Sequence, residues 1–293
     1  MPAEPDARRL KEICEVESVP TLRTVVTRVL AALDEDTDLA GVSHLISEDP
    51  AITAQVLRIS NSVFYNASGL STTSVHDAVS RIGGAQVRNL VVSLGVVDAF
   101  GDLHAGFDYP GFWKHSFTTA LAAGEVAARS PRLRMRGSTR DNPYFLAGLL
   151  HDIGTLLLCQ QLGDEYLEVL EQGRSQGRPL PEMERETFGF DHQDVGAALI
   201  RRWGLPFEVA AAAQFHHRVG AAPADSRDYV AVVHVANLIG TGRGLDPDES
   251  PAEAERLELE SLGLGESELP SLLEGVARAA EQSELLLLIA LPG

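Results

Sequence analysis

The chain of 293 residues is long enough for one large or two modest domains with a sizeable buried core. Its 44% hydrophobic and 23% charged residues are ordinary for a globular protein. The formal net charge of −18 argues against general affinity for nucleic acids or anionic membranes, because their phosphate groups repel such a surface.

Cysteine usage and hydropathy indicate the compartment. The two cysteines, Cys14 and Cys159, are too few for a disulfide scaffold and are typical of a reducing environment. No apolar run approaches the roughly 20 residues that span a bilayer, and the polar, acidic N-terminus does not resemble a signal peptide. We therefore expect a cytoplasmic protein without a membrane span.

Helix patterns fill the first third of the chain. A stripe of apolar residues with helical periodicity runs from Leu22 to Leu33, and residues that favour helix N-caps follow at Asp38, Asp49 and Ser74. A proline directly after Asp49 suits the first position of a helix. These signals predict a compact N-terminal helical bundle over residues 15–104.

The remainder, residues 105–293, is predicted to form a second helical subdomain. Its expected helices lie at 112–128, 145–160, 191–203, 207–217, 230–238, 251–262 and 266–290. Its expected loops lie at 101–111, 129–140, 173–181 and 241–250. Sustained period-2 alternation is absent from the whole sequence, so the expected fold class is all-α.

The loop at 129–140 is rich in arginine. Its members are Arg129, Arg132, Arg134, Arg136 and Arg140. A solvated loop is the favoured interpretation, and contact with an anion or nucleotide is the alternative.

The stretch 145–155 is the most informative, because an apolar helix pattern there contains the adjacent His151 and Asp152. A buried ionised group is costly unless it is paired or bound to a metal. The neighbours of His151 three and four residues away are all small, namely Ala147, Gly148, Gly154 and Thr155. A metal corner, a catalytic pair and a structural remnant all remain open here.

Further histidines recur in three other predicted helices. Together with the His–Asp pair they make a candidate metal-ligand set of His115, His151, Asp152, His192, His216 and His217. Imidazole nitrogens with carboxylate oxygen suit Zn, Fe or Mn. Most of their helix neighbours are small, so four helices could approach closely and direct these side chains at one point.

Each histidine also has a structural interpretation. His115 beside Trp113 could be a packed or capping residue, and His192 could simply belong to the first turn of a helix. His216 and His217 could lie near a helix C-terminus, where the dipole favours a charged imidazole. No Gly-x-Ser-x-Gly elbow and no P-loop occurs, so other catalytic patterns are poor and no catalytic residue is assigned.

The order of these motifs resembles the HD superfamily of metal-dependent phosphohydrolases, and more closely its HDOD module, the HD-related output domain. In the first half the matching motifs are Val19–Pro20, Glu48–Ala51, Asn61–Ser62 and Ile82–Gly83. In the second half they are Trp113–Ser116, Leu150–Gly154, Gly189–His192, Trp203–Pro206 and His216–His217. The resemblance covers residues 15–283.

The resemblance implies an N-terminal helical bundle followed by a distorted HD-type helical core. It also implies a role in bacterial signal transduction, with a signalling protein as partner, a link to cyclic-dinucleotide pathways and an open question of homo-oligomerisation. A divalent metal, Fe, Mn, Zn or Mg, is the cofactor that the resemblance implies.

The chain departs from the HD hydrolases at one position. They usually complete the metal site with a late aspartate, where this sequence has Asn237, and His234 is a candidate substitute. Asparagine brings no negative charge, which weakens a divalent site. We therefore expect a regulator that binds a protein or ligand without hydrolase turnover. The alternative is a metal-dependent phosphohydrolase acting on a nucleotide or cyclic dinucleotide.

Overall fold

The computed structural model describes residues 7–15, 19–34, 38–62, 65–66, 69–100, 104–135, 143–240, 259–265, 267–268, 270–278 and 281. All regular structure in these residues is helical, which confirms the predicted all-α class. The chain divides into two compact units, described separately below. The bundle unit comprises residues 20–101, and the histidine unit comprises residues 1–19 and 102–284.

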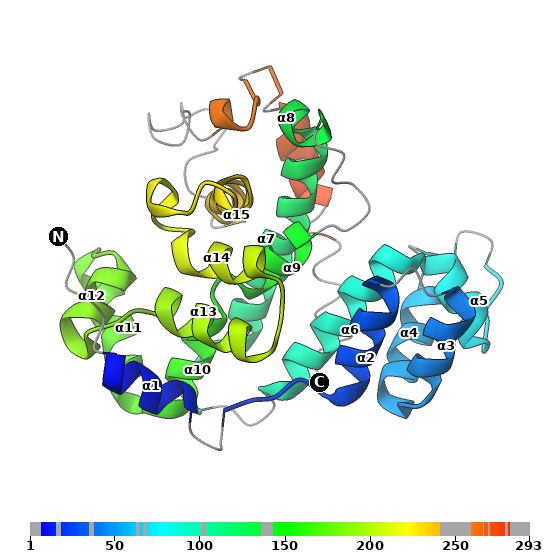
Figure 1. Ribbon diagram of the computed structural model, residues 1–293, viewed down its shortest axis with the longest axis horizontal. Coiled ribbons are helices and arrows are strands. Elements are labelled where there is room, and N and C mark those ends of the chain that lie inside the picture. Colours follow the sequence, from blue (N-terminus) through cyan, green and yellow to red (C-terminus); the bar gives the residue numbers. More distant parts are fainter. Residues whose placement is uncertain are drawn as a thin grey trace. The chain divides into compact units, whose positions relative to one another are not determined.

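Five helices, drawn blue to cyan in Figure 1, form the bundle unit. They are α2 (Thr24–Asp34), α3 (Leu39–Ser47), α4 (Pro50–Ser60), α5 (Val75–Ile82) and α6 (Gly84–Ala99). The apolar stripe of α2 is buried through Val26 and Val29, which are both 0% exposed. A side chain at Gly95 of α6 would collide with Val26, so α2 and α6 pack closely at this point.

The three predicted N-caps of the bundle unit are present. Asp38 accepts a hydrogen bond from the backbone of Gly41, and Ser74 accepts one from Asp77. Asp49 accepts from the first turn of α4 and also forms an ion pair with Arg23 at 2.6 Å. These caps satisfy backbone donors that a helix leaves free at its start.

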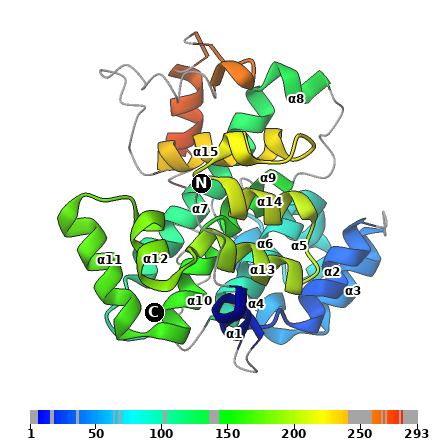
Figure 2. The ribbon, with the colours of Figure 1, turned by 60° about the vertical axis from the view of Figure 1, so that its left-hand side comes forward.

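The histidine unit contains the remaining labelled helices, and residues 259–261 and 270–278 within the predicted C-terminal helices are also helical. The labelled helices are α1 (Ala7–Glu15), α7 (Tyr109–Arg129), α8 (Pro131–Met135), α9 (Pro143–Leu150), α10 (Ile153–Leu162), α11 (Asp164–Gln176), α12 (Leu180–Phe188), α13 (His192–Arg202), α14 (Phe207–Phe215), a 3₁₀ turn (Val219–Ala221) and α15 (Arg227–Gly240). In Figure 2, α15 lies across α7, α9 and α14, and α11 lies beside α12. Their core includes Leu149, Leu150 and Ile153, all 0% exposed.

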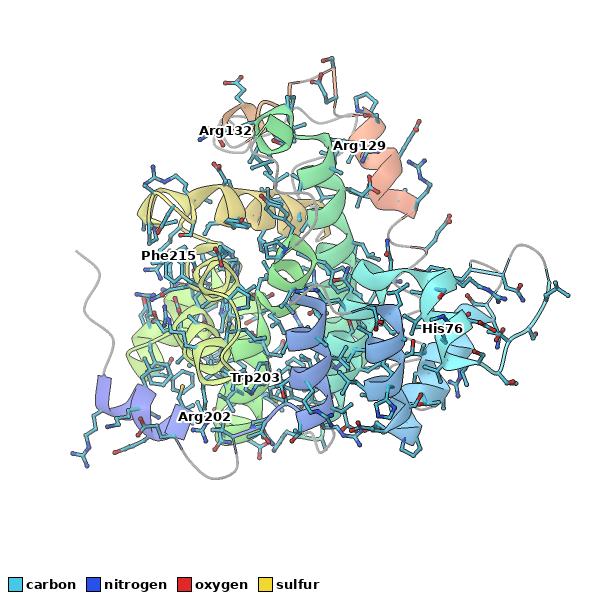
Figure 3. All side chains as sticks on the ribbon, turned by 45° about the vertical axis from the view of Figure 1, so that its right-hand side comes forward. His76, Arg129, Arg132, Arg202, Trp203 and Phe215 are labelled. Carbon is cyan, nitrogen blue, oxygen red and sulfur yellow. The ribbon has the colours of Figure 1, made fainter. Side chains whose placement is uncertain are left out.

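Helix α1 belongs to the histidine unit, where it packs against α13. Arg202, labelled in Figure 3, donates a hydrogen bond of 2.7 Å to the carbonyl oxygen of Cys14. The guanidinium of Arg9 lies 5.4 Å from the centre of the Phe188 ring, a cation–π contact with α12. The first helix is therefore fastened to the second half of the chain.

Several predicted boundaries were wrong. Helix α7 begins at Tyr109 inside the expected linker, because Asp108 caps it and Pro110 occupies its first turn. The expected loop 173–181 is reduced to a few residues, since α11 continues to Gln176 and α12 begins at Leu180.

The arginine-rich segment is partly helical rather than a loop, because α8 occupies residues 131–135. Arg129 pairs with Glu125 in α7. Arg132, also labelled in Figure 3, donates to the Ser261 carbonyl oxygen at 2.8 Å and pairs with Asp228 at 3.3 Å. The Arg134 side chain, Arg136 and Arg140 lie outside the described residues, as do the segments expected at 241–250 and 282–293.

One described stretch, Pro143–Leu162, has the length and composition of a membrane-spanning helix, with a mean hydropathy of 1.3. This differs from the sequence-based prediction of no apolar run of this length. Because 78% of its window is buried inside the protein, the stretch has the environment of a core helix.

Candidate metal centre

The six predicted ligands come from four segments of the histidine unit. His115 lies within α7, His192 begins α13, and His216 ends α14 with His217 directly after it. His151 and Asp152 lie between α9 and α10, and not inside one continuous helix as the sequence predicted. The helix breaks there because Asp152 adopts the non-helical angles φ −104° and ψ 11° as the N-cap residue of α10.

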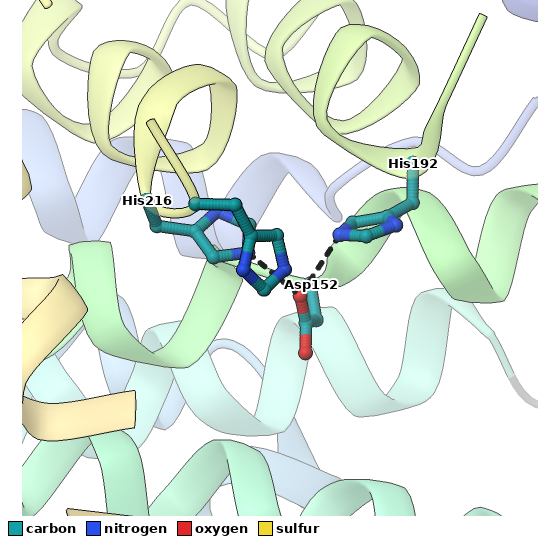
Figure 4. A group of neighbouring side chains, drawn as sticks. Asp152, His192 and His216 are labelled. Atoms are coloured by element: carbon teal, nitrogen blue, oxygen red, sulfur yellow. Dashed lines mark ion pairs between the residues drawn. The ribbon is translucent and has the colours of Figure 1, made fainter. Parts of the chain in front are cut away.

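Asp152 is the centre of the cluster. Its Oδ1 atom lies 3.2 Å from Nε2 of His216 and 3.5 Å from Nε2 of His192. Figure 4 shows these two imidazoles approaching the carboxylate from different helices. With His217 they form a group of potential ligand atoms that all lie within 4.8 Å of one another, here called corner A.

The other carboxylate oxygen faces a second group. Oδ2 of Asp152 lies 3.0 Å from Nε2 of His151 and 3.5 Å from Nε2 of His115. The potential ligand atoms of Asp152, His115 and His151 also lie within 4.8 Å of one another and form corner B. All six predicted residues thus fall into two groups that share one carboxylate.

Hydrogen bonds fix which nitrogen of each ring faces Asp152. The Nδ1 atoms of His151 and His216 donate to the carbonyl oxygens of Gly148 at 2.7 Å and Ala213 at 3.0 Å. A neutral imidazole that donates through Nδ1 carries a lone pair on Nε2. Nε2 of His151 can accept from Nε2 of His115, which lies 3.1 Å away. Nε2 of His216 has no hydrogen-bond partner among the described residues, so in the neutral ring its lone pair faces the carboxylate unless a cation lies between them.

Corner A contains three buried polar atoms without a hydrogen-bond partner among the described residues. They are Oδ1 of Asp152, Nε2 of His192 and Nε2 of His216. Unsatisfied buried polar atoms cost free energy, and ones that converge on one point have the chemistry of a cation site. The residues present therefore fit a divalent metal bound by imidazole and carboxylate.

Burial and neighbouring charges shift the pKa values of His216, His192 and Asp152 in different directions. Burial lowers the pKa of His216 to about 4. Burial alone would also lower the pKa of His192, but the Glu184 carboxylate raises that pKa to about 9. Burial acts to raise the pKa of Asp152, yet the surrounding imidazoles, His151 foremost, hold it well below its usual range. The centre of the site is thus an ionised carboxylate.

Small residues allow the helices to approach. A side chain at Gly154 would overlap the backbone of His192 and of Gly196, so α10 and α13 meet backbone to backbone. A Cβ at Gly148 would lie 2.7 Å from the Cα of Ala120, which brings α9 equally close to α7. The glycines beside the His–Asp pair therefore bring its ligand-bearing neighbours within reach.

His234 and Asn237, compared above with the late aspartate of HD hydrolases, both lie on α15. His234 donates from Nδ1 to the carbonyl oxygen of His216 at 2.7 Å, so it supports a ligand-bearing turn and belongs to neither corner. A Cβ on Gly240 would lie 3.7 Å from Nδ1 of His115. Asn237 is three residues from both His234 and Gly240, so it lies on the same face of α15 as these two residues. Its side chain is 8% exposed.

Sequence reasoning missed Glu184, which is 0% exposed and accepts a hydrogen bond of 2.7 Å from Nδ1 of His192. The expected loop at 173–181 left its helix unassigned. A usable signal was its spacing, since Glu184 precedes Phe188 by one helical turn and shares the apolar face of α12.

A helical fold with an His–Asp pair and three further histidine positions defines an HD-type protein. The HDOD domain model matches residues 19–219. The chain therefore belongs to the HDOD family, as the motifs predicted.

Three solved structures share the fold over nearly the entire chain. An HDOD domain protein of unknown function from Geobacter sulfurreducens is 26% identical, with a TM-score of 0.78 and coverage of 95% of this chain and 98% of that one. A candidate signal transduction protein from Marinobacter aquaeolei VT8 is 25% identical, with a TM-score of 0.77, 96% of this chain and 61% of that one. A candidate phosphohydrolase from Shewanella amazonensis SB2B is 25% identical, with a TM-score of 0.74 and coverage of 96% of this chain and 98% of that one.

Among curated proteins, an uncharacterized protein of Treponema pallidum (strain Nichols) is 25% identical over 243 residues. The match includes 81% of this chain and 44% of the relative, so this chain spans less than half the length of that protein.

Proposed function

We propose that this chain is a signalling module that acts by binding, and that its His/Asp cluster holds a divalent cation as part of the fold. The observation that carries the proposal is the position of Asp152 between imidazoles from α7, α13 and α14. A cation there ties separate helices together, because metal binding and folding are coupled when the ligands come from distant segments. Fe, Mn, Zn and Mg are the candidate ions, with imidazole favouring the first three.

The signalling role rests on membership of the HDOD family and on the likeness to the signal transduction candidate from Marinobacter. The bundle unit supplies the surface for a protein partner of a cytoplasmic signalling pathway, including cyclic-dinucleotide pathways, or for a second copy of the chain. Leu70 of this unit is 72% exposed, so its side chain is available to a partner and can be changed to test this surface.

The charge of the cluster favours binding over turnover. Among the described residues, Asp152 is the one carboxylate that belongs to both corners. Because no other carboxylate among the described residues is a potential ligand of either corner, a second divalent cation would add positive charge that no further ligand offsets. Asn237, which we align with the late aspartate of HD hydrolases, adds no charge to offset the excess.

Metal analysis tests the proposal. We expect the full chain, purified without chelator, to retain divalent metal, and the His151→Ala and Asp152→Ala variants to lose it. Glu186→Gln, a change on the exposed outer side of α12, is the matched control and should keep the metal. Equal metal content in wild type and both cluster variants would refute the metal site. For the binding role, we expect a pull-down to recover a signalling protein that Leu70→Asp no longer captures.

A phosphohydrolase is the second candidate, because the site is open to water. The side chains of His115 and Asp152 are 21% and 22% exposed, and His217 is exposed, so solvent reaches both corners. A bound divalent metal would supply a water with a lowered pKa for attack on phosphate. Turnover of nucleotides or cyclic dinucleotides with Mn²⁺ or Fe²⁺, lost in Asp152→Ala, would establish this function in place of the first.

A further inference from the structure

A buried carboxylate lies directly behind one of the proposed ligands. Glu184 of α12 is 0% exposed, and its Oε2 atom accepts hydrogen bonds from both Nδ1 of His192, at 2.7 Å, and the backbone nitrogen of His192, at 3.0 Å. Two hydrogen bonds to one residue fix both the ring and the start of α13. A carboxylate is rarely fully buried without such compensation.

The carboxylate is itself held from the other side. The hydroxyl of Tyr166 in α11, also 0% exposed, donates to Oε1 of Glu184 at 2.5 Å. A continuous chain of hydrogen bonds therefore connects Tyr166, Glu184 and His192 across three helices.

This support is asymmetric between the two corners. Nδ1 of His151 in corner B donates to a neutral carbonyl oxygen, and so does Nδ1 of His216 in corner A. His192 donates to a carboxylate instead. A carboxylate behind a ligating imidazole orients the ring, increases its basicity and adds negative charge near the metal.

We propose that Glu184, held by Tyr166, is a positioning residue for His192 and makes corner A the first and tighter of two cation sites. The inference rests on the proposed metal site and adds an order of loading to it. Oδ1 and Oδ2 of Asp152 would then bind two different cations. Corner A holds the structural ion, and corner B takes up a cation only at higher concentration.

Zinc titration of the full chain tests this order. The protein is stripped with EDTA, dialysed, and titrated with Zn²⁺ against a chromophoric chelator at constant pH. For wild type we expect two classes of site. Glu184→Gln should weaken the tighter class by about 10- to 100-fold, the usual effect of removing such a partner, and Tyr166→Phe should weaken the same class less. His115→Ala should remove the weaker class alone.

Glu186→Gln is the control, because Glu186 lies on the same helix but is exposed and pairs with Arg178. It should leave both classes unchanged. A role confined to packing would lower the thermal midpoint of metal-free Glu184→Gln and weaken both classes together, and that result would overturn the proposal. Wild-type affinity in both Glu184→Gln and Tyr166→Phe would also overturn it, while leaving the metal site intact. A wild-type chain that takes up no Zn²⁺ would instead refute the metal site itself.

Discussion

Nε2 of His216 and Oδ1 of Asp152 lie 3.2 Å apart with no hydrogen-bond partner for either atom among the described residues. The other ring nitrogen of His216 is already committed to a backbone carbonyl. This pairing of two buried acceptors makes the metal-free state of the cluster unfavourable, and it leads to the first prediction.

Zinc should raise the thermal stability of wild type and not that of Asp152→Asn. Asparagine keeps the size of Asp152 but removes the negative charge shared by both corners. At a free Zn²⁺ concentration 100 times the dissociation constant, ligand linkage stabilises the folded protein by about 2.7 kcal/mol. Thermal unfolding monitored by circular dichroism, with and without Zn²⁺, measures the difference. An equal zinc-induced shift in the variant would contradict the role of Asp152.

Gly154→Ala should destabilise the histidine unit by about 1–3 kcal/mol, the usual cost of overpacking a tight contact. The added methyl would overlap the backbone of His192 and Gly196, which cannot move aside as a side chain can. Gly124→Ala on α7 is the matched control. A Cβ there meets nothing within 4 Å, so this change should be neutral or gain up to about 1 kcal/mol from helix propensity. The denaturant midpoint of Gly154→Ala should therefore fall below that of wild type, and the midpoint of Gly124→Ala should stay equal or rise.

Asp49→Ala should cost more than Asp49→Asn in the bundle unit. Both changes remove the ion pair with Arg23, whose side chain is 41% exposed, so that loss alone amounts to less than about 1 kcal/mol. Alanine also removes the cap on the backbone nitrogens of Ala51 and Ile52, at about 1 kcal/mol, whereas asparagine still caps. Urea unfolding of both variants separates the contribution of the ion pair from that of the helix cap. Equal midpoints would show that the cap contributes nothing.

Both cysteines should resist alkylation in the folded protein at pH 8. Burial raises the pKa of Cys14 to about 11, so about one thiol in a thousand is ionised at that pH, and the thiolate is the reactive form. Burial also raises the pKa of Cys159, which is 0% exposed. Labelling with iodoacetamide, followed by mass spectrometry, should show slow modification that accelerates as pH rises toward 11 and is complete in urea. Rapid labelling of Cys14 at pH 8 would contradict the burial of α1 against α13.

Local signals made much of the fold predictable. The caps at Asp38, Asp49 and Ser74 were readable because a capping side chain acts on backbone atoms two or three residues away. The resemblance to HDOD modules likewise rested on short motifs. Helix existence and order followed from such signals, while the start of α7 was missed because its proline and tyrosine were assigned to a linker.

The rest of the site depends on distant contacts. The spacing of Glu184 places it on the apolar face of α12, but its partner His192 is identified only when α12 packs beside α13. The break at His151–Asp152 is similar. An apolar run favours one long helix, and the backbone contact of Gly154 with α13 lies in another part of the chain. The small residues beside the pair were visible in sequence, but the helices that use the space were not.

The bundle unit is an insertion in the covalent order of the histidine unit, because α1 comes before it and packs on α13 after it. Truncation at the start of α7 would therefore not yield a whole folding unit. It would discard a helix, leave Arg202 without the Cys14 carbonyl oxygen and expose the surface that α1 covers. A stand-alone histidine unit would need α1 rejoined to α7 through a designed linker in place of residues 20–101.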